Sequence, residues 1–217
     1  FMSSSLLPIT YRSILGVALP MMVSGFIQSI VLITDSAFIS RYSVAGFDAV
    51  GNAGLAYITF YMMLLGMSDG AQILMARRIG ESREDQLGRI LNATWVILGI
   101  LAVIFFTILT LFIPSWISAY SRNQEVASLQ GEFIRHRSFA LFFCMITLGL
   151  QAFYLARGKS WVVLVAALIT ASTNILFDYL LIFGIGVFPE MGVAGAATAS
   201  SIADGLGMIF LVVFTLS

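Results

Sequence analysis

Four aspartates lie in stretches that are otherwise almost entirely apolar: Asp35, Asp69, Asp178 and Asp204. On insertion scales an acidic side chain near the middle of a membrane helix costs about 2.5 to 3.5 kcal/mol, so we expect each to have a partner or a use. Two carboxylates that share a poorly hydrated pocket cannot both ionise cheaply, and such a pair can exchange a proton. The same oxygens could instead surround a hard cation such as Na⁺. The residue types do not choose between these ions.

Asp35 and Asp178 are expected at a similar depth. Each lies five or six residues before the end of its predicted span, roughly 8 Å below the same membrane surface at about 1.5 Å per residue. Asn174 precedes Asp178 by one helical turn, Gln28 precedes Asp35 by two, and Thr198 is expected at nearly the same depth. The predicted cation site is therefore Asp35, Asn174, Asp178 and Thr198.

Simpler interpretations exist for the same acids. Asp35 and Asp178 could hydrogen-bond neighbouring helices or face lipid headgroups. Asp69 is expected to form a salt bridge at the helix end with Arg77 or Arg78. Asp204, some thirteen residues into its span, either lines a cavity or pairs with residues beyond this chain.

Several other residues also have simple structural interpretations. Pro20 lies seven residues into the first span, where it removes a backbone hydrogen bond and marks either a hinge or a static bend. His136 is expected at the membrane interface, and Cys144 in packing. Small residues at spacings of three and four predict close helix contact: Gly192, Gly195, Ala196, Ala199 and Ser200.

The composition predicts that the elements carrying these residues lie in a bilayer. Of the 217 residues, 59% are hydrophobic and 10% are charged, and the mean hydropathy is +0.99. The 11 basic and 11 acidic residues balance, so no charge excess indicates nucleic acid as a partner.

Six stretches are long enough to cross a hydrocarbon core, which takes roughly 20 apolar residues. The class is therefore all-α, a polytopic membrane protein with one membrane domain over residues 1–217. Polar breaks are expected between the spans, among them Arg41 to Gly51 and Tyr120 to Glu132. The predicted spans are 13–40, 52–76, 90–119, 133–156, 161–184 and 192–216.

Basic residues in the connections predict the orientation, since they are retained on the cytoplasmic side. Seven on one side against four on the other favour a cytoplasmic N-terminus. The first set is Arg12, Arg77, Arg78, Arg83, Arg89, Arg157 and Lys159, and the second is Arg41, Arg122, Arg135 and Arg137.

Several motifs together carry a family resemblance. They are Leu19-Pro20, the run Thr34 to Ile39, the glycine-punctuated stretch Gly66 to Gly80, Asn174 to Gly184, and Met191 to Ala197. With these motifs the whole chain resembles the N-terminal lobe of a multidrug and toxic compound extrusion (MATE) transporter, near the prokaryotic DinF-type branch.

The resemblance implies a fold and a site. It implies one six-helix lobe of a twelve-helix protein whose C-terminal lobe is absent from this chain, with Asp35, Asn174, Asp178 and Thr198 as the H⁺ or Na⁺ site. It implies a bend at Pro20 and a supporting role for Gln28 and Gln151. Gln151 departs from the family, where Asn is more typical, and Asp204 stands where an uncharged amide is more usual.

The expected function is antiport of an organic, often cationic, compound against H⁺ or Na⁺ by alternating access, in a cell inner (plasma) membrane. We expect a transporter and not an enzyme, with no cofactor beyond the coupling ion and with the bilayer and the C-terminal lobe as partners. A lipid-linked saccharide flippase of the same superfamily is an alternative, although the spans carry few charges. A two-aspartate intramembrane protease using Asp178 and Asp204 is an alternative of another class. A transport-dead or self-assembling half is a third.

Overall fold

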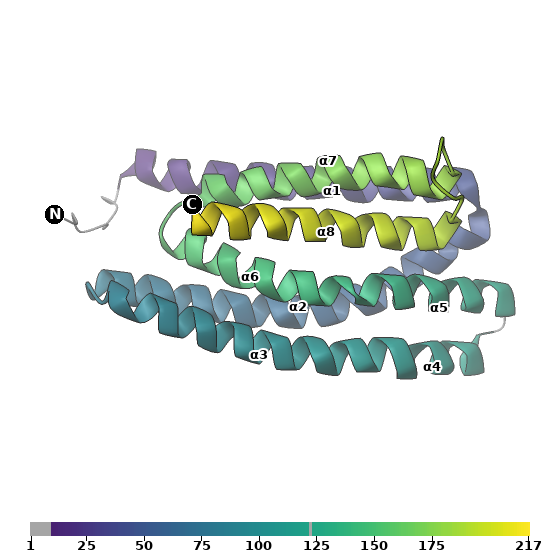
Figure 1. The fold of residues 1–217 in the computed structure, drawn as a ribbon, viewed down its shortest axis with the longest axis horizontal. Coiled ribbons are helices and arrows are strands. Elements are labelled where there is room, and N and C mark those ends of the chain that lie inside the picture. Colours follow the sequence, from purple (N-terminus) through teal and green to yellow (C-terminus); the bar gives the residue numbers. More distant parts are fainter. Residues whose placement is uncertain (1–9, 122) are drawn as a thin grey trace.

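The computed structural model describes residues 10–121 and 123–217, and nearly all of them are helical. The order of elements along the chain is α1 (Tyr11–Tyr42), α2 (Val44–Gly80), the 3₁₀ turn η1 (Glu84–Gln86), α3 (Leu87–Thr107), the π-helical stretch η2 (Ile108–Phe112), α4 (Ile113–Tyr120), α5 (Gln124–Ser138), α6 (Ala140–Ala156), α7 (Ser160–Phe183) and α8 (Gly192–Leu216). All run roughly along one long axis, as Figure 1 shows. The all-α prediction is confirmed.

Five helical stretches are long and apolar enough to cross a membrane, and the pair α5 and α6 makes a sixth if it is counted as one span. This pair is bent by 44° between Ser138 and Ala140. The fourth predicted span, residues 133–156, therefore covers the end of α5, this bend and all of α6. The six predicted stretches otherwise lie within the helices found here.

Two of the expected polar breaks are largely helical. Ser43 is the only residue between α1 and α2, and its hydroxyl accepts a hydrogen bond from the Gly46 amide at 3.1 Å. Asn123 starts α5 in the same way by accepting from the amides of Glu125 and Val126. Each side chain satisfies amides that a helix leaves without a partner at its N-terminus, so the next helix begins at once.

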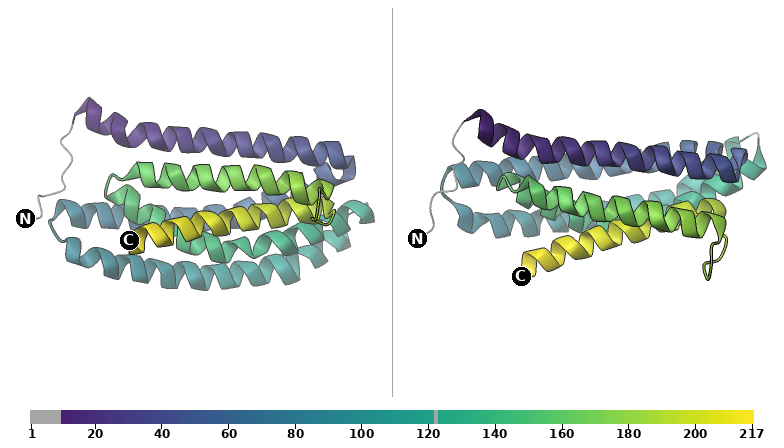
Figure 2. Two further views of the ribbon diagram at one scale, coloured as in Figure 1. Left: turned by 45° about the horizontal axis from the view of Figure 1, so that its top comes forward. Right: turned by 90° about the horizontal axis from the view of Figure 1, so that it is seen from above.

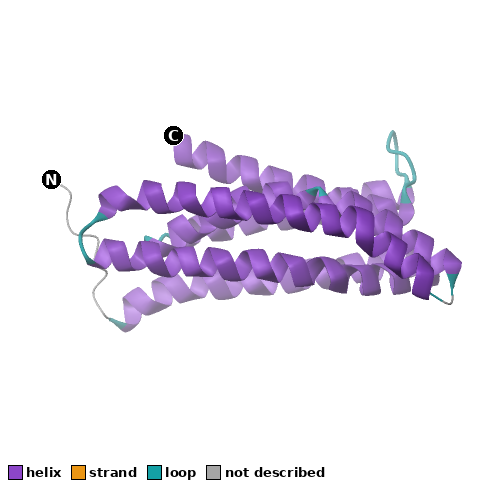
Figure 3. Cartoon of the chain, turned by 90° about the horizontal axis from the view of Figure 1, so that it is seen from below, coloured by secondary structure: helices purple, strands orange, loops and turns teal. Residues whose placement is uncertain are grey.

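The helices form a bundle in which α1 lies at an edge. Figure 2 shows α1 running beside α7, and Figure 3 shows the bundle from below. The chief apolar core lies between α2, α3, α5, α6 and α8, where Leu64, Leu98 and Leu141 are completely buried. The start of α1, the α2–α3 connection and the α6–α7 connection lie at one end of the bundle (Figure 1). The basic residues predicted to share one side therefore gather at that end.

Close packing of α7 against α8 depends on a glycine. A Cβ atom at Gly195 would lie 2.7 Å from the backbone oxygen of Leu181, a distance that no side-chain carbon tolerates. Gly195 therefore lets α8 approach the α7 backbone directly. This contact confirms that the small residues there serve packing, and it fixes how side chains of α7 and α8 meet.

Candidate functional site

The structure brings Asp35 and Asp178 together across the interface of α1 and α7. Their carboxyl groups lie close enough to act on each other electrostatically. Asp178 is completely buried and Asp35 is half-buried. Two distant parts of the chain, 143 positions apart, therefore share one carboxyl pocket.

Several oxygens in this pocket have no hydrogen-bond donor among the residues that the structure describes. They are Oδ1 of Asp35, both carboxyl oxygens of Asp178, and Oδ1 of Asn174. A buried carboxylate without a partner is costly, and a shared proton or a bound cation would supply what these oxygens lack. The pocket can therefore hold one small positive charge.

Asn174 lies one turn before Asp178 on α7 and is only 2% exposed. Its amide nitrogen donates to Ser200 Oγ of α8 at 3.1 Å, and its amide oxygen, one turn from Asp178, has no hydrogen-bond partner among the described residues and could serve as an additional ligand. Sequence reasoning had placed Ser200 among the packing residues. Its position beside Asn174 follows from the direct contact of α7 and α8, which spacing along one helix does not reveal.

Thr198 does not join this set in the described structure. Its hydroxyl donates to the Ala194 carbonyl oxygen at 2.7 Å and lies 3.4 Å from His136 Nδ1 of α5. Positions 198 and 200 are about 200° apart around a helix of 3.6 residues per turn, so Ser200 turns toward α7 while Thr198 turns toward α5. Matching depth alone was therefore not enough to predict a shared site. His136, which is expected at the membrane interface, is exposed on α5 and is the residue that Thr198 faces.

The donor set suits a hard monovalent cation better than a transition metal. No group of three or more His, Cys, Asp or Glu side chains within residues 10–121 and 123–217 is arranged to hold a metal ion. Asp35 and Asp178 supply carboxyl oxygens and Asn174 supplies an amide oxygen. Oxygen-only ligands of this kind fit Na⁺, and the carboxyl pair alone fits H⁺.

The two glutamines remain outside the pocket's hydrogen bonds. Gln28 is exposed on α1, and Gln151 is half-buried on α6. Neither side chain is hydrogen-bonded to Asp35 or Asp178 in the described part of the chain. The hydrogen bonds of Asn174 and Thr198 also go to residues other than these glutamines. Their supporting role stays a prediction.

Pro20 lies inside α1 without ending the helix. Proline has no amide hydrogen, so the carbonyl of Gly16, four residues earlier, loses its usual partner. The hydroxyl of Ser160, the first residue of α7, donates to this Gly16 oxygen at 3.5 Å, and the Ser24 hydroxyl donates to the Pro20 oxygen at 2.8 Å. The proline is thus tied to α7, the helix that also carries Asp178.

Asp204 forms an ion pair inside the lobe. Its Oδ2 atom lies 2.7 Å from Nη1 of Arg137 on α5, and the two side chains are 22% and 18% exposed. Asp204 therefore has a partner within this chain, and Arg137, which the sequence counts among the basic residues of the outer set, is that partner. Arg137 lies in the last turn of α5, just before the bend between α5 and α6.

Asp69 does not form the predicted helix-end salt bridge. Arg77 Nε and Arg78 Nη1 instead contact Glu81, at 2.9 and 2.6 Å, and these bonds lower the pKa of the Glu81 carboxyl. Asp69 is exposed on α2, two turns before Arg77. Glu81 wins because it is three and four residues from the two arginines, where helix side chains meet.

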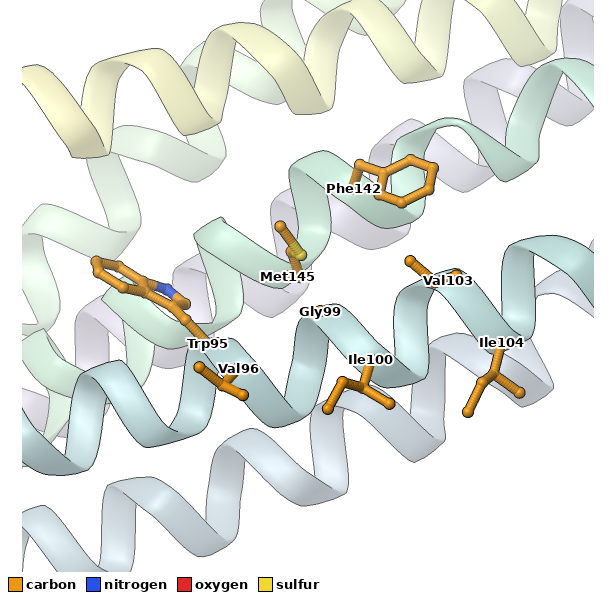
Figure 4. A pocket seen from close by; sticks show the side chains of 8 residues that line it. All are labelled: Trp95, Val96, Gly99, Ile100, Val103, Ile104, Phe142 and Met145. Atoms are coloured by element: carbon orange, nitrogen blue, oxygen red, sulfur yellow. The ribbon is translucent and has the colours of Figure 1, made fainter.

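An apolar groove of about 540 Å³ lies elsewhere, between α3 and α6. Figure 4 shows Trp95, Val103, Phe142 and Met145 along it. None of its eight lining residues is ionisable, so the groove offers no chemistry for a cation.

Comparison with known proteins shows to which family the chain belongs. The family model MatE matches residues 20–180, most of the chain and both halves of the carboxyl pair. The chain belongs to the MatE family.

Curated MatE relatives are similar along nearly all of this chain. The probable multidrug resistance protein NorM of Thermotoga maritima is 27% identical over 206 residues, covering 94% of this chain and 44% of the relative. The protein of the same name from Rhizobium meliloti is 26% identical over 194 residues, covering 89% and 41%. This MatE chain therefore spans about half the length of the curated relatives that it matches.

A solved structure confirms the MatE fold. The outward-facing conformation of a multidrug resistance MATE family transporter of the MOP superfamily matches with a TM-score of 0.87 at 20% identity, covering 94% of this chain and 44% of that one. The chain is a multi-pass membrane protein with the fold of one MATE lobe. MatE relatives are transporters, and Asp204 here is held by Arg137, so the two-aspartate protease interpretation is wrong.

Proposed function

We propose that this chain is the N-terminal lobe of an antiporter that exports organic, often cationic, compounds in exchange for H⁺ or Na⁺. The observation that carries the proposal is the buried pocket of Asp35, Asp178 and Asn174, whose oxygens lack donors among the described residues. A pocket with surplus negative charge and no fixed cation bound to it favours a mobile one. The C-terminal lobe is the partner, and the substrate class follows the names of the relatives.

Coupling requires that the cation bind the two transport conformations with different affinity. The carboxyl pair spans α1 and α7, so any relative shift of these helices changes the distance between the two acids. Cation binding then favours the conformation in which the acids are together. The basic residues at one end of the bundle support a cytoplasmic N-terminus in the plasma membrane.

The test uses the complete two-lobe transporter in proteoliposomes, with ethidium or norfloxacin as substrate and pH and Na⁺ gradients imposed separately. Asp35→Asn and Asp178→Asn each remove one charge, and a charged hydrogen-bonding partner is worth about 1.5 to 3 kcal/mol, or roughly tenfold or more in cation affinity. We expect gradient-driven efflux to fall accordingly.

Asp69→Asn is the matched control, because it removes an exposed acid from another span. Its efflux should fall less than that of Asp35→Asn, because Asp69 has no part in the carboxyl pocket. Unchanged gradient-driven efflux in Asp35→Asn would remove the carboxyl pair from the mechanism. A gradient response to only one of the two ions identifies the coupling ion.

A further inference from the structure

The apolar groove between α3 and α6 is hollow because of a glycine. Gly99 lies in the middle of α3, and a Cβ atom there would lie 3.5 Å from Met145 Sδ, which is an ordinary contact. Helix packing therefore does not require a glycine at this position, although glycine inside a helix is less stable than alanine. The missing side chain leaves the groove that Figure 4 shows beside Trp95, Val103 and Phe142.

The groove is preformed, because its end wall is held in place. The indole Nε1 of Trp95 donates to the Ile146 carbonyl oxygen of α6 at 3.3 Å. The ring also lies directly against Gly149, where a Cβ atom would overlap it. Trp95 is thus fixed across the interface of α3 and α6, and its rotation does not close the groove.

The groove opens away from the core of the bundle. Val96, Ile100 and Val103 of α3 are each more than half exposed. In Figure 1, α3 lies at the edge of the bundle opposite α1 and α7, which carry the carboxyl pair. An outward apolar surface in the middle of a membrane-spanning helix meets the acyl chains of the bilayer.

The groove has about the length of one leaflet. Its residues on α3 run from Trp95 to Ile104, a distance of roughly 14 Å at about 1.5 Å of rise per residue. A hydrocarbon core of about 30 Å gives each leaflet about 15 Å. The groove therefore fits one acyl chain from the leaflet at the end of the bundle where α3 begins.

A basic side chain lies on the same face of α3, at the depth of the headgroups. Arg89 precedes Val96 by two helical turns, so the two residues share one side of the helix. Along the axis Arg89 lies roughly 9 Å before Trp95, which is about the depth of a headgroup layer. Arg89 is exposed, and no ion pair within residues 10–121 and 123–217 includes it. Its charge is available to a phosphate.

The end of the bundle around Arg89 carries a surplus of positive charge. The connections 77–89 and 157–160 contain six basic side chains and three acidic ones. Two of these acids, Glu81 and Glu84, are already engaged in ion pairs with arginines. An anionic headgroup complements this surplus, and its phosphate supplies the charged acceptors that the Arg89 guanidinium lacks.

We propose that this groove and Arg89 form a binding site for an anionic glycerophospholipid, with one acyl chain along α3 and the phosphate on the guanidinium. An organic cation is a poorer occupant, because Arg89 repels it. The site lies on the opposite edge of the bundle from the carboxyl pair, so the inference does not depend on the transport activity proposed above.

The experiment measures lipid binding to the complete two-lobe transporter in mild detergent, by native mass spectrometry of the lipid-bound fraction. Phosphatidylglycerol and phosphatidylcholine with identical acyl chains are titrated separately. One basic side chain at a membrane surface changes affinity for an anionic lipid about fivefold, so the wild type should prefer phosphatidylglycerol by about that factor. Glycerol 3-phosphate, which has the phosphate without a chain, should not compete.

Substitutions separate the headgroup contact from the chain contact. Arg89→Gln should bring the affinities for the two lipids to within about twofold of each other. Gly99→Leu fills the groove and should weaken the binding of both lipids at least about threefold. Val103→Phe fills the same space if Gly99→Leu does not fold. Arg12→Gln is the matched control, because it removes another exposed basic residue at this end of the bundle and should retain the preference.

Three results would overturn the inference. Equal affinities of the wild type for the two lipids, or an unchanged preference in Arg89→Gln, would remove Arg89 from the site. Unchanged lipid binding in the folded groove-filling variants would show that the chain lies elsewhere and that the C-terminal lobe or other lipids cover this face. Displacement of the lipid by ethidium would assign the groove to the transported substrate. Binding is measured without a gradient, so none of these results bears on the proposed function.

Discussion

Two charged pairs lie inside this bundle and differ in how their charge is offset. Asp35 and Asp178 face each other with several oxygens that lack a donor among the described residues, whereas Asp204 contacts Arg137 at 2.7 Å. Both pairs join helices that are far apart in the sequence. The first pair brings together two groups of like charge, and the second brings together opposite charges.

The difference separates a site for a mobile charge from a site with a fixed one. An acid that already has an arginine partner gains little from a cation in solution, because its charge and its hydrogen bonds are satisfied. Two acids without such a partner gain a great deal. The identity of the neighbouring residue, rather than the depth of the acid in the membrane, therefore indicates which aspartates can bind a coupling ion.

The largest effect is expected when the acid pair is given a fixed cation. Asn174→Lys places an ammonium group one turn from Asp178, where side chains four residues apart meet. We expect gradient-driven efflux to fall more than about tenfold, since the fixed charge replaces the mobile one at a cost above about 1.4 kcal/mol. Initial rates at matched amounts of folded protein measure the effect.

Asn174→Met is the control for this prediction, because the methionine side chain is similar in length to that of lysine but carries no charge. It should weaken cation affinity by the loss of one oxygen ligand and retain the response to the gradient. Wild-type gradient dependence in Asn174→Lys would show that the pocket does not rely on surplus negative charge.

The second prediction concerns a substitution that weakens the surroundings of the Arg137–Asp204 ion pair without changing any charge. Tyr57→Leu removes the ring that faces Arg137, and a cation–π contact of this kind is worth about 0.5 to 2 kcal/mol. The free energy of unfolding in detergent should decrease by at least that amount, because the substitution also removes buried volume from the core. Tyr57→Phe keeps the ring and should stay close to wild type, so equal losses in both variants would assign the effect to the hydroxyl near Cys144 instead.

The smallest effect concerns the proline of α1 and its contact with α7. Ser160→Ala removes the donor to the Gly16 oxygen, and a bond as long as 3.5 Å should contribute no more than about 0.5 to 1 kcal/mol. Pro20→Ala returns a backbone donor to that oxygen. Ser160→Ala should therefore destabilise the wild type slightly and be silent in the Pro20→Ala background, as a double-mutant cycle by thermal unfolding would reveal.

The sequence predicts the spans well because hydropathy over some twenty residues is a strong signal. It also brings Asp35 and Asp178 to one depth, and the packing of α1 on α7 does the rest. It fails where the direction of a side chain around its helix determines which neighbour it contacts, as for Thr198 and Ser200. It fails again at Arg137, which the sequence places in a connection but which lies in α5 and pairs with Asp204 of α8.

Helix boundaries show the same limit at a smaller scale. The interval from Arg41 to Gly51 contains two charges and two glycines, which is typical of a loop, yet Ser43 alone separates α1 from α2. A capping hydroxyl can start a helix within one residue, and mean hydropathy does not detect it. The absence of a salt bridge at Asp69 has a similar origin, since Glu81 is better spaced from the arginines.

The ion pair at the α5–α6 bend also has a consequence for the order of assembly. Asp204 follows Arg137 by 67 positions, so Arg137 must wait for its partner during synthesis. At about 5 to 20 residues per second, ribosomes need roughly 3 to 13 s to reach that point. The fourth span therefore holds an unmatched charge until the sixth emerges, and the contact between α5 and α8 can form only after every later helix of the lobe has been made.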